Sequence, residues 1–227
     1  MNGDLHYITE EPRTPESDEG VSPLMIILHG YGADERDLMT LAPYFDPRLR
    51  TISIRAPLDL PQGGHAWFPL EFTESGLKTN REDVEKARDV LVHVVCNLQV
   101  AHGNDSNNTM LLGFSQGAAM ALAVGFSAPG TASSMIALSG FFAPEMVPTD
   151  PNILRALEAR SVIMTHGTDD AVITIDRSHA SRDRVQQTPV RLQYNEYSMG
   201  HEINQECLAD VVDWVAGMLA DRGGTVP

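Results

Sequence analysis

Ser115 lies in the segment 113–117, which reads Gly-Phe-Ser-Gln-Gly and places glycines two residues before and two residues after a candidate nucleophile. This spacing is typical of a nucleophile elbow, a sharp turn between a strand and a helix that exposes a serine hydroxyl. Without a Cβ at 113 and 117, the strand and the helix can approach closely. The chemistry that this pattern indicates is acyl transfer through a serine ester. The same pattern also occurs in ordinary Gly-rich turns with a surface serine, so the rest of the chain must supply partners.

A serine hydroxyl needs a base to take its proton and a third group to orient that base. Asp169 and Asp170 follow the apolar run 162–165, and His201 follows the alternating segment 190–197. Groups at the carboxyl ends of parallel strands meet in one crevice. The order serine, aspartate, histidine is that of the α/β-hydrolase triad. We therefore predict that the serine is the nucleophile and that His201 is its base.

The other histidines compete less well for the role of base. His29 and His166 each precede a glycine at a predicted strand end, so we expect both to be hydrogen-bonded beneath the site. His65 is a minor candidate near an aromatic segment. The remaining four lie in the N-terminal segment or on predicted helices: His6, His93, His102 and His179.

An acyl-transfer site also needs two hydrogen-bond donors for the carbonyl oxygen that becomes negative, and losing one costs about 3–4 kcal/mol. The backbone N–H of Gln116, at the start of the predicted helix, is one candidate. The other is the backbone N–H of Tyr31, in the loop after the first buried strand. Trp67 and Phe68 lie in an aromatic segment without clear periodicity. They form either a wall of the substrate pocket or a small additional core.

The elements that must position these groups alternate between strands and helices. Besides the strand that enters the elbow, we predict strands at 24–28, 51–54, 135–138, 162–165 and 190–197, with an edge strand near 5–9. Helical periodicity predicts helices at 34–45, 82–101, 116–127, 152–158, 175–187 and 202–219. This alternation predicts an α/β fold with a mainly parallel sheet and helices on both faces. We expect one domain over residues 1–227, in which 1–23 is an acidic N-terminal segment.

Composition excludes several classes of function. The net charge of −15 disfavours nucleic-acid and anionic-membrane partners, which need clustered Lys and Arg. Cys96 and Cys207 lie in predicted helices, so no disulfide framework is expected. The residue spacing of a zinc site is not seen, so we predict no metal. An apolar run long enough to span a membrane and a secretory signal are not seen either, so we predict no membrane span and a cytoplasmic location. His-Gly-Tyr-Gly after the first strand is not a dinucleotide-binding turn. The sequence is compatible with a homodimer.

Five segments together resemble the phospholipase/carboxylesterase family of small α/β-hydrolases, which includes acyl-protein thioesterases and bacterial carboxylesterases. They are Leu-His-Gly-Tyr-Gly at 28–32, Gly-Gly-His-Ala-Trp-Phe at 63–68, Gly-Phe-Ser-Gln-Gly-Ala at 113–118, His-Gly-Thr-Asp-Asp at 166–170 and Gly-His-Glu at 200–202. The resemblance runs in matching order from about residue 24 to about residue 219. It implies a cytosolic serine hydrolase without a cofactor, acting on carboxylic esters and some acyl thioesters. The insert between residues 56 and 76 is short and has few apolar side chains, so we expect a minimal lid.

Carried over residue by residue, the resemblance implies that Ser115, His201 and Asp170 form the triad. It also implies oxyanion donors at Tyr31 and Gln116, with the Trp67 loop beside the substrate. Asp169 is then a solvated turn carboxylate that helps to cap the helix beginning near 174–176. Two features depart from the family: Ala-Val-Ile follows the triad aspartate where a proline is frequent, and the N-terminal segment is longer and more acidic.

The function expected from the sequence is hydrolysis of carboxylic esters with short-to-medium acyl chains. One alternative is an acyl thioesterase that uses the same triad. The other is a binding protein of hydrolase fold without turnover.

Overall fold

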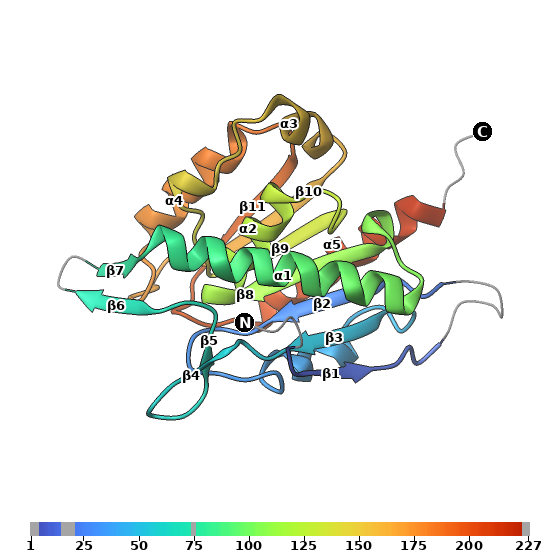
Figure 1. Ribbon diagram of the computed structural model, residues 1–227, viewed down its shortest axis with the longest axis horizontal. Coiled ribbons are helices and arrows are strands. Elements are labelled where there is room, and N and C mark those ends of the chain that lie inside the picture. The colour runs from blue at the N-terminus through green and yellow to red at the C-terminus, as the bar shows by residue number, and fades with distance from the viewer. Residues whose placement is uncertain (1–4, 15–20, 74–75, 224–227) are drawn as a thin grey trace.

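A seven-stranded sheet forms the centre of the computed structural model, which describes residues 5–14, 21–73 and 76–223 (Figure 1). The strand order is β1-β3-β2-β8-β9-β10-β11. The strands are β1 (Tyr7–Glu10), β2 (Leu24–Leu28), β3 (Arg50–Ile54), β8 (Thr109–Phe114), β9 (Ser134–Leu138), β10 (Ser161–Gly167) and β11 (Arg191–Tyr197). Only β1 runs antiparallel to its neighbour, and every other pair in this sheet is parallel. The mainly parallel sheet predicted from the sequence is therefore confirmed.

Helices cover both faces of the sheet because its central strands are apolar on both sides. The helices are α1 (Arg81–His102), α2 (Gln116–Ser127), α3 (Pro151–Leu157), α4 (Ile175–Gln186) and α5 (Gln205–Gly223). On one face, Leu24, Ile26 and Leu28 share a core with α1 and α2, and Figure 1 shows α1 running across that face. On the other face, Met25 and Ile27 pack with α5 and with the 3-10 helix η1 (Leu38–Tyr44).

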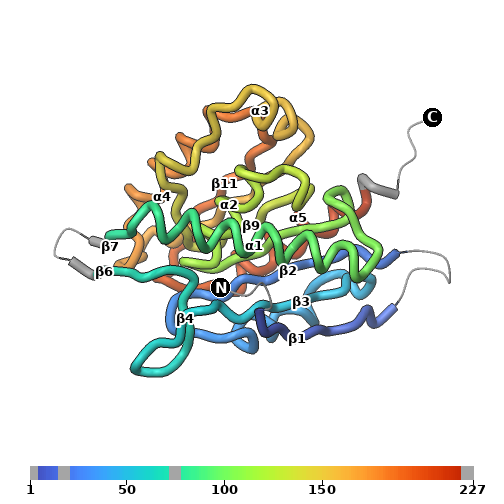
Figure 2. Tube along the Cα trace, viewed as in Figure 1, coloured from blue at the N-terminus to red at the C-terminus, as the bar shows by residue number. Residues whose placement is uncertain are grey.

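The insert between β3 and α1 contains two short hairpins that the sequence pattern did not predict. They are β4 (Leu58–Asp59) with β5 (His65–Ala66), and β6 (Leu70–Thr73) with β7 (Gly76–Thr79). Figure 1 shows β6 and β7 side by side near the N-terminal end of α1, and Figure 2 traces the described parts of the insert in the same view. In the described part of the insert these hairpins are the only regular elements, which fits a minimal lid.

Two predicted helices differ from the structure at identifiable residues. The predicted helix 34–45 is wrong: Asp34 Oδ1 accepts from Arg36 N in a tight turn, and the 3-10 helix that follows has Pro43 inside it. Pro43 has no N–H for an α-helical hydrogen bond. The last helix begins at Gln205 rather than at 202, because Asn204 Oδ1 accepts from Cys207 N at 2.8 Å and caps it.

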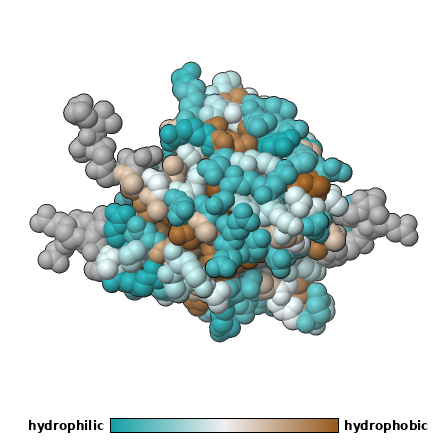
Figure 3. All heavy atoms as spheres, turned by 180° about the vertical axis from the view of Figure 1, so that it is seen from behind, coloured by the Kyte–Doolittle hydropathy of each residue, from teal (hydrophilic) through white to brown (hydrophobic). Residues whose placement is uncertain are grey.

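The predicted edge strand forms β1, while the rest of the acidic segment 1–23 lies partly outside the described residues. Cys96 and Cys207 are both free. Within the described ranges, no helix has the length and apolarity needed to cross a membrane. Figure 3 shows a largely hydrophilic face from behind, with apolar residues in small groups, so this face gives no argument for a homodimer.

Candidate active site

The turn between β8 and α2 holds Ser115 in a strained conformation. Its φ of 55° and ψ of −115° are unusual for a residue with a side chain. Two backbone hydrogen bonds maintain the turn: Ser115 N donates to Leu138 O at 2.9 Å, and Ser115 O accepts from Ala119 N at 3.1 Å. The strand ahead, the helix behind and the neighbouring strand β9 therefore all fix the position of this serine.

The glycines of the elbow are required by contacts between backbones. A Cβ on Gly113 would overlap the backbone of Gly117, and a Cβ on Gly117 would overlap the carbonyl groups of Leu28 and His29. Both overlaps are with main chain, which cannot rotate out of the way as a side chain can. The glycine spacing therefore lets α2 lie directly against β8 and against the end of β2.

Ser115, His201 and Asp170 form a hydrogen-bonded chain. His201 Nε2 lies 2.8 Å from Ser115 Oγ, and His201 Nδ1 lies 2.7 Å from Asp170 Oδ2. A carboxylate can only accept, so Nδ1 carries the proton and Nε2 presents a lone pair to the serine hydroxyl. The structure thus brings together three residues that are far apart in the sequence, in an arrangement that can activate a hydroxyl.

Asp170 is held in place by the turn that follows it. Its side chain is buried, and Oδ1 accepts from Val172 N at 2.8 Å and from Ile173 N at 2.9 Å. These bonds occupy one carboxylate oxygen and leave Oδ2 for His201. Ala-Val-Ile after the aspartate, where a proline is frequent in the family, therefore still gives a firmly held carboxylate.

Asp169 is exposed and lies outside this chain. Its Oδ2 is 3.3 Å from Thr168 Oγ1 and 3.5 Å from Ser198 Oγ. The prediction that Asp169 helps to cap α4 is wrong: the N-cap residue Thr174 has no side-chain cap bond, and the turn before α4 is bonded by Asp170. Adjacent aspartates on an extended loop point in different directions, and here the second one points inward.

His29 and His166 are buried and hydrogen-bonded, which confirms their predicted place beneath the site. His29 Nε2 accepts from Ala56 N at 3.0 Å, and its Nδ1 is 2.7 Å from Gly30 O. His166 Nε2 is 2.7 Å from Ile173 O and 3.4 Å from Asp170 Oδ2. Burial lowers the pKa of both imidazoles, so they are neutral near pH 7.

The side chain of Gln116 connects the elbow to the aromatic segment. Its Oε1 accepts from Trp67 N at 2.9 Å, and its Nε2 donates to Phe68 O at 2.7 Å. The indole N–H of Trp67 donates to His29 O at 2.8 Å. Trp67 and Phe68 are only 2% and 1% exposed, which matches the core alternative; their contact with substrate stays a prediction.

The two predicted oxyanion donors belong to segments that border Ser115. Gln116 follows it directly as the first residue of α2. Tyr31 follows Gly30, where an added Cβ would lie 3.5 Å from Ser115 Cβ, so this loop passes beside the serine. Gly32, with a φ of 85°, donates its N–H to His65 O at 2.9 Å and fixes the far end of the loop. His65 thus contributes to loop position from β5.

Two residues near the triad were missed by the sequence interpretation. The ring of Phe114 lies against the imidazole of His201, with centroids 4.9 Å apart. Ser139 is buried with a φ of 48°; its N–H donates to Thr165 O at 2.9 Å, and its hydroxyl donates to Glu202 O at 3.3 Å. The available signal for Ser139 was its Ser-Gly pair at the end of a predicted strand.

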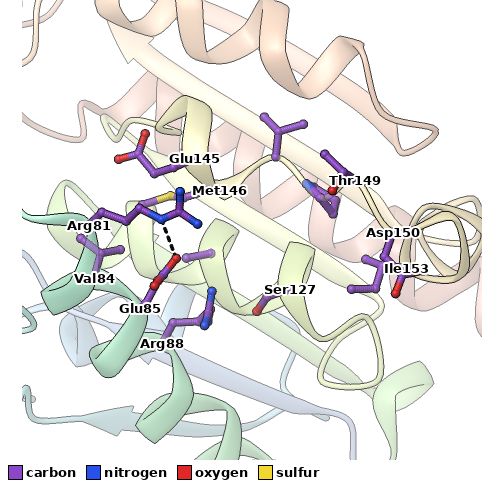
Figure 4. A pocket seen from close by; sticks show the side chains of 13 residues that line it. Arg81, Val84, Glu85, Arg88, Ser127, Glu145, Met146, Thr149, Asp150 and Ile153 are labelled. Atoms are coloured by element: carbon purple, nitrogen blue, oxygen red, sulfur yellow. Dashed lines mark hydrogen bonds and ion pairs between the residues drawn. The ribbon is translucent and has the colours of Figure 1, made fainter.

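A separate cavity of about 260 Å³ lies between α1, α2 and the segment 145–153 (Figure 4). Figure 4 shows Arg81 paired with Glu85 on the α1 side. None of Ser115, His201 and Asp170 lines this cavity. Among the described residues there is also no group of three or more His, Cys, Asp or Glu side chains placed to hold a metal ion.

The mostly parallel seven-stranded sheet, with Ser115 at the strand–helix elbow and His201 after the last strand, defines an α/β hydrolase. A sequence profile of the phospholipase/carboxylesterase family matches residues 9–219. The chain belongs to this family, and it is a carboxylesterase-type hydrolase of class EC 3.1.

Relatives agree with this assignment. A probable carboxylesterase of Oryza sativa subsp. japonica is 28% identical over 213 residues, which cover 87% of this chain and 88% of the relative. The crystal structure of esterase PE8 has a TM-score of 0.74 and 26% identity, and the match covers 94% of this chain and 99% of that one. The carboxylesterase of Bacillus cereus has a TM-score of 0.81 over 96% of each chain; at 18% identity it shows the fold alone.

Proposed function

We propose that this protein hydrolyses carboxylic esters through an acyl-enzyme intermediate on Ser115. The observation that carries the proposal is the hydrogen-bonded chain from Ser115 Oγ through His201 to Asp170. A serine at a strained elbow with an imidazole nitrogen at 2.8 Å is suited to lose its proton as it attacks. The backbone hydrogen bonds of the elbow hold the strained Ser115 in one conformation, so little reorganisation is needed before reaction.

In the proposed mechanism, Ser115 Oγ bonds to the ester carbonyl carbon while its proton passes to His201 Nε2. The backbone N–H groups of Tyr31 and Gln116 hold the oxygen that becomes negative. His201 then gives its proton to the leaving alcohol oxygen as the C–O bond breaks. Water, deprotonated by the same imidazole, attacks the acyl-serine and releases the acid. Asp170 keeps the imidazole in the required tautomer throughout.

We further propose that the substrates have short-to-medium acyl chains. The support is the small size of the two hairpins in the described part of the insert between β3 and α1, whose strands have only two or four residues each. Such an insert offers no large lid that would open at a lipid interface. Thioesters are attacked by the same groups, so a thioesterase differs in its pocket rather than in its triad.

The decisive experiment is labelling with a fluorophosphonate probe together with hydrolysis of a nitrophenyl ester. We expect Ser115→Ala to lose both labelling and hydrolysis. Ser198→Ala, at an exposed serine of the loop that carries His201, is the matched control and should keep both. Labelling that survives Ser115→Ala would overturn the mechanism, and a folded wild type without hydrolysis or labelling would favour the binding-protein alternative.

A panel of esters and thioesters of graded chain length then tests the substrate class. We expect the highest kcat/KM for soluble esters of short or medium chain. A preference for long-chain thioesters would move the function to the thioesterase alternative. Three further predictions accompany this proposal: one domain, a cytoplasmic location and no cofactor.

A further inference from the structure

The edge of the sheet opposite to Ser115 carries a cluster of polar residues that the ester chemistry does not use. The strands from β8 to β11 are parallel, so they all begin at this edge. Ser161 at the start of β10 pairs in register with Ser134 on β9 and with Arg191 on β11. Residues in register on parallel strands point to the same face. Here it is the α5 face, because Ile136 and Ile163, two positions further along, pack with α5.

A hollow of about 230 Å³ opens at this place. Two arginines, three serines and one asparagine dominate its lining, with only two apolar side chains: Asn107, Ser133, Ser134, Ala159, Arg160, Ser161, Arg191 and Met218. Ser134 and Ser161 are buried, so their hydroxyls belong to the interior of the hollow rather than to its rim. The hydroxyl of Ser133 already donates to Thr109 O, so the donors that face a ligand come from the other polar residues of the lining. The lining also carries two positive charges and no carboxylate.

Arg160 is poorly satisfied by the protein itself. Its Nε is buried and has no hydrogen-bond partner among the described residues. Its two terminal nitrogens make only long contacts, 3.4 Å to Asn107 Oδ1 and 3.3 Å to Ser106 Oγ. A buried donor without a partner costs about 1–3 kcal/mol, so such a group usually has a function.

The two arginines of the hollow also differ from most others in the chain. Within the part of the chain that the structure describes, neither Arg160 nor Arg191 forms an ion pair. The following arginines do: Arg13, Arg36, Arg48, Arg50, Arg55, Arg81, Arg88 and Arg182. In a chain with a net charge of −15, two neighbouring arginines that form no ion pair with a described carboxylate are unusual.

The groups around the hollow define the charge of its ligand. Guanidinium N–H groups and serine hydroxyls are donors that suit oxyanions. Asp105, in the turn before β8, attracts Arg160 but does not line the hollow. The last turns of α5, near Met218, present partial negative charge, which opposes an anion. Two full positive charges outweigh that partial charge. Burial lowers the pKa of Arg160, yet a guanidinium stays protonated near pH 7.

We propose that this hollow binds a tetrahedral oxyanion: a phosphate group, either free or carried on a small phosphomonoester. Donors come from the starts of three neighbouring strands and from the turn before β8, so several of them can reach one ligand. A tetrahedral group with several oxygens can use all of them, whereas one guanidinium fork already satisfies a carboxylate.

The test compares the melting temperature in sodium phosphate with that in sodium chloride at equal ionic strength, near neutral pH. Phosphate stabilises most proteins by exclusion from their surface, so the informative quantity is the difference between variants. Wild type should gain about 3 °C more than Arg160→Gln when phosphate is well above its Kd. Arg191→Gln should lose much of the same gain. Arg155→Gln, at an exposed arginine of α3 outside the hollow, is the matched control and should behave as wild type.

Isothermal titration with inorganic phosphate and with glycerol phosphate distinguishes the two forms of the ligand. Binding of both indicates a site for a phosphomonoester, and binding of phosphate alone indicates the free anion. If Arg160→Gln does not fold, Arg191→Gln decides, because its side chain is exposed and the fold does not depend on it. Equal phosphate responses of wild type and Arg191→Gln, or no heat of binding to wild type, would overturn the proposal.

Discussion

The two adjacent aspartates after β10 show how one residue step changes the role of a carboxylate. Asp170 is buried and accepts two backbone N–H bonds in addition to its contact with His201. Asp169 is exposed and touches only hydroxyl groups. The contacts of Asp170 therefore hold its carboxylate in one position, and those of Asp169 do not.

Asp170→Asn should lower kcat by up to about four orders of magnitude if Asp170 holds the tautomer of His201. The Asn oxygen can still accept from Val172 N and Ile173 N, so the turn should survive. The amide nitrogen then faces His201 and donates to Nδ1, which moves the imidazole proton to Nε2. That tautomer cannot take the proton of Ser115. Steady-state hydrolysis of a nitrophenyl ester measures the loss.

Asp169→Asn is the matched control, and its rate should change far less. Circular dichroism of both variants checks that they fold. A larger loss from the Asp169 substitution in folded protein would assign the third triad position to Asp169 instead.

At the scale of the secondary-structure elements, the start of α2 lies directly against backbone, and Gly117 permits this close approach. Its missing Cβ leaves room for the carbonyl groups of Leu28 and His29, so the helix can lie against the end of β2. Any displacement of α2 also displaces Gln116 and Ser115.

Gly117→Ala should therefore destabilise the fold by about 1–3 kcal/mol and reduce activity further than stability alone explains. Gly217→Ala is the matched control, because Gly217 lies in α5 with open space where the Cβ would be. Removing a glycine from an exposed helix position should add about 0.5–1 kcal/mol. Urea denaturation measures both changes. Equal effects of the two substitutions would show that the overlap at Gly117 is relieved without cost.

The elements that the sequence predicted best are those with a strong and simple pattern. Leu24–Leu28 and Gln116–Ser127 were predicted to the residue, because a continuous apolar run and a run of small helix formers leave little choice. The β4–β5 hairpin was missed because its strands, Leu58–Asp59 and His65–Ala66, are too short to show alternation. The helix expected at 34–45 failed because local turn bonds and Pro43 override its apolar spacing.

Within the site, too, the residues with a simple sequence pattern were predicted, and contacts between distant segments were missed. Chain order and motif spacing were enough to select Ser115 and His201 for a common site, and the structure brings their side chains together. The contacts of Phe114 and Ser139 were missed because they depend on which strand ends are neighbours. The sequence order of the strands does not reveal this: β8, which precedes the elbow, lies between β2 and β9.

For the molecule as a whole, a buried carboxylate joins three parts of the N-terminal half. Glu35, in the loop after β2, receives two hydrogen bonds of 2.6 Å from Arg55, which follows β3. His6, just before β1, lies 3.5 Å away. The hydrogen bonds from Arg55 lower the pKa of Glu35 to about 2 from its ordinary 4.5. Ionised Glu35 therefore stabilises the folded chain.

This contribution should depend on pH in one direction. It is fully present above about pH 4.5, and it disappears as the pH falls toward 2, where Glu35 becomes protonated in both states. Arg55→Met should lower the free energy of unfolding at neutral pH by up to about 3 kcal/mol, because it leaves a buried charge without its main partner. Urea denaturation at a series of pH values measures both quantities.

The Arg55 variant should lose less stability than wild type between pH 4.5 and 2. Arg36→Met is the control, because Arg36 is largely exposed and its nearest approach to Glu35 is 3.8 Å. An acid profile unchanged by Arg55→Met would show that other carboxylates govern acid unfolding.

The indole of Trp67 is an intrinsic fluorescent probe that lies close to Ser115 and its neighbouring loop. The Trp67 side chain is buried, and its indole N–H donates to His29 O. The backbone N–H of Trp67 donates to the side-chain oxygen of Gln116. Any change at Ser115 that shifts the loop or the elbow must therefore alter the surroundings of this fluorophore. The sequence contains only one other tryptophan, Trp214. In a Trp214→Phe variant, phosphonylation of Ser115 should appear as a shift in the emission of Trp67, so acylation and deacylation could be followed in real time without a coloured substrate.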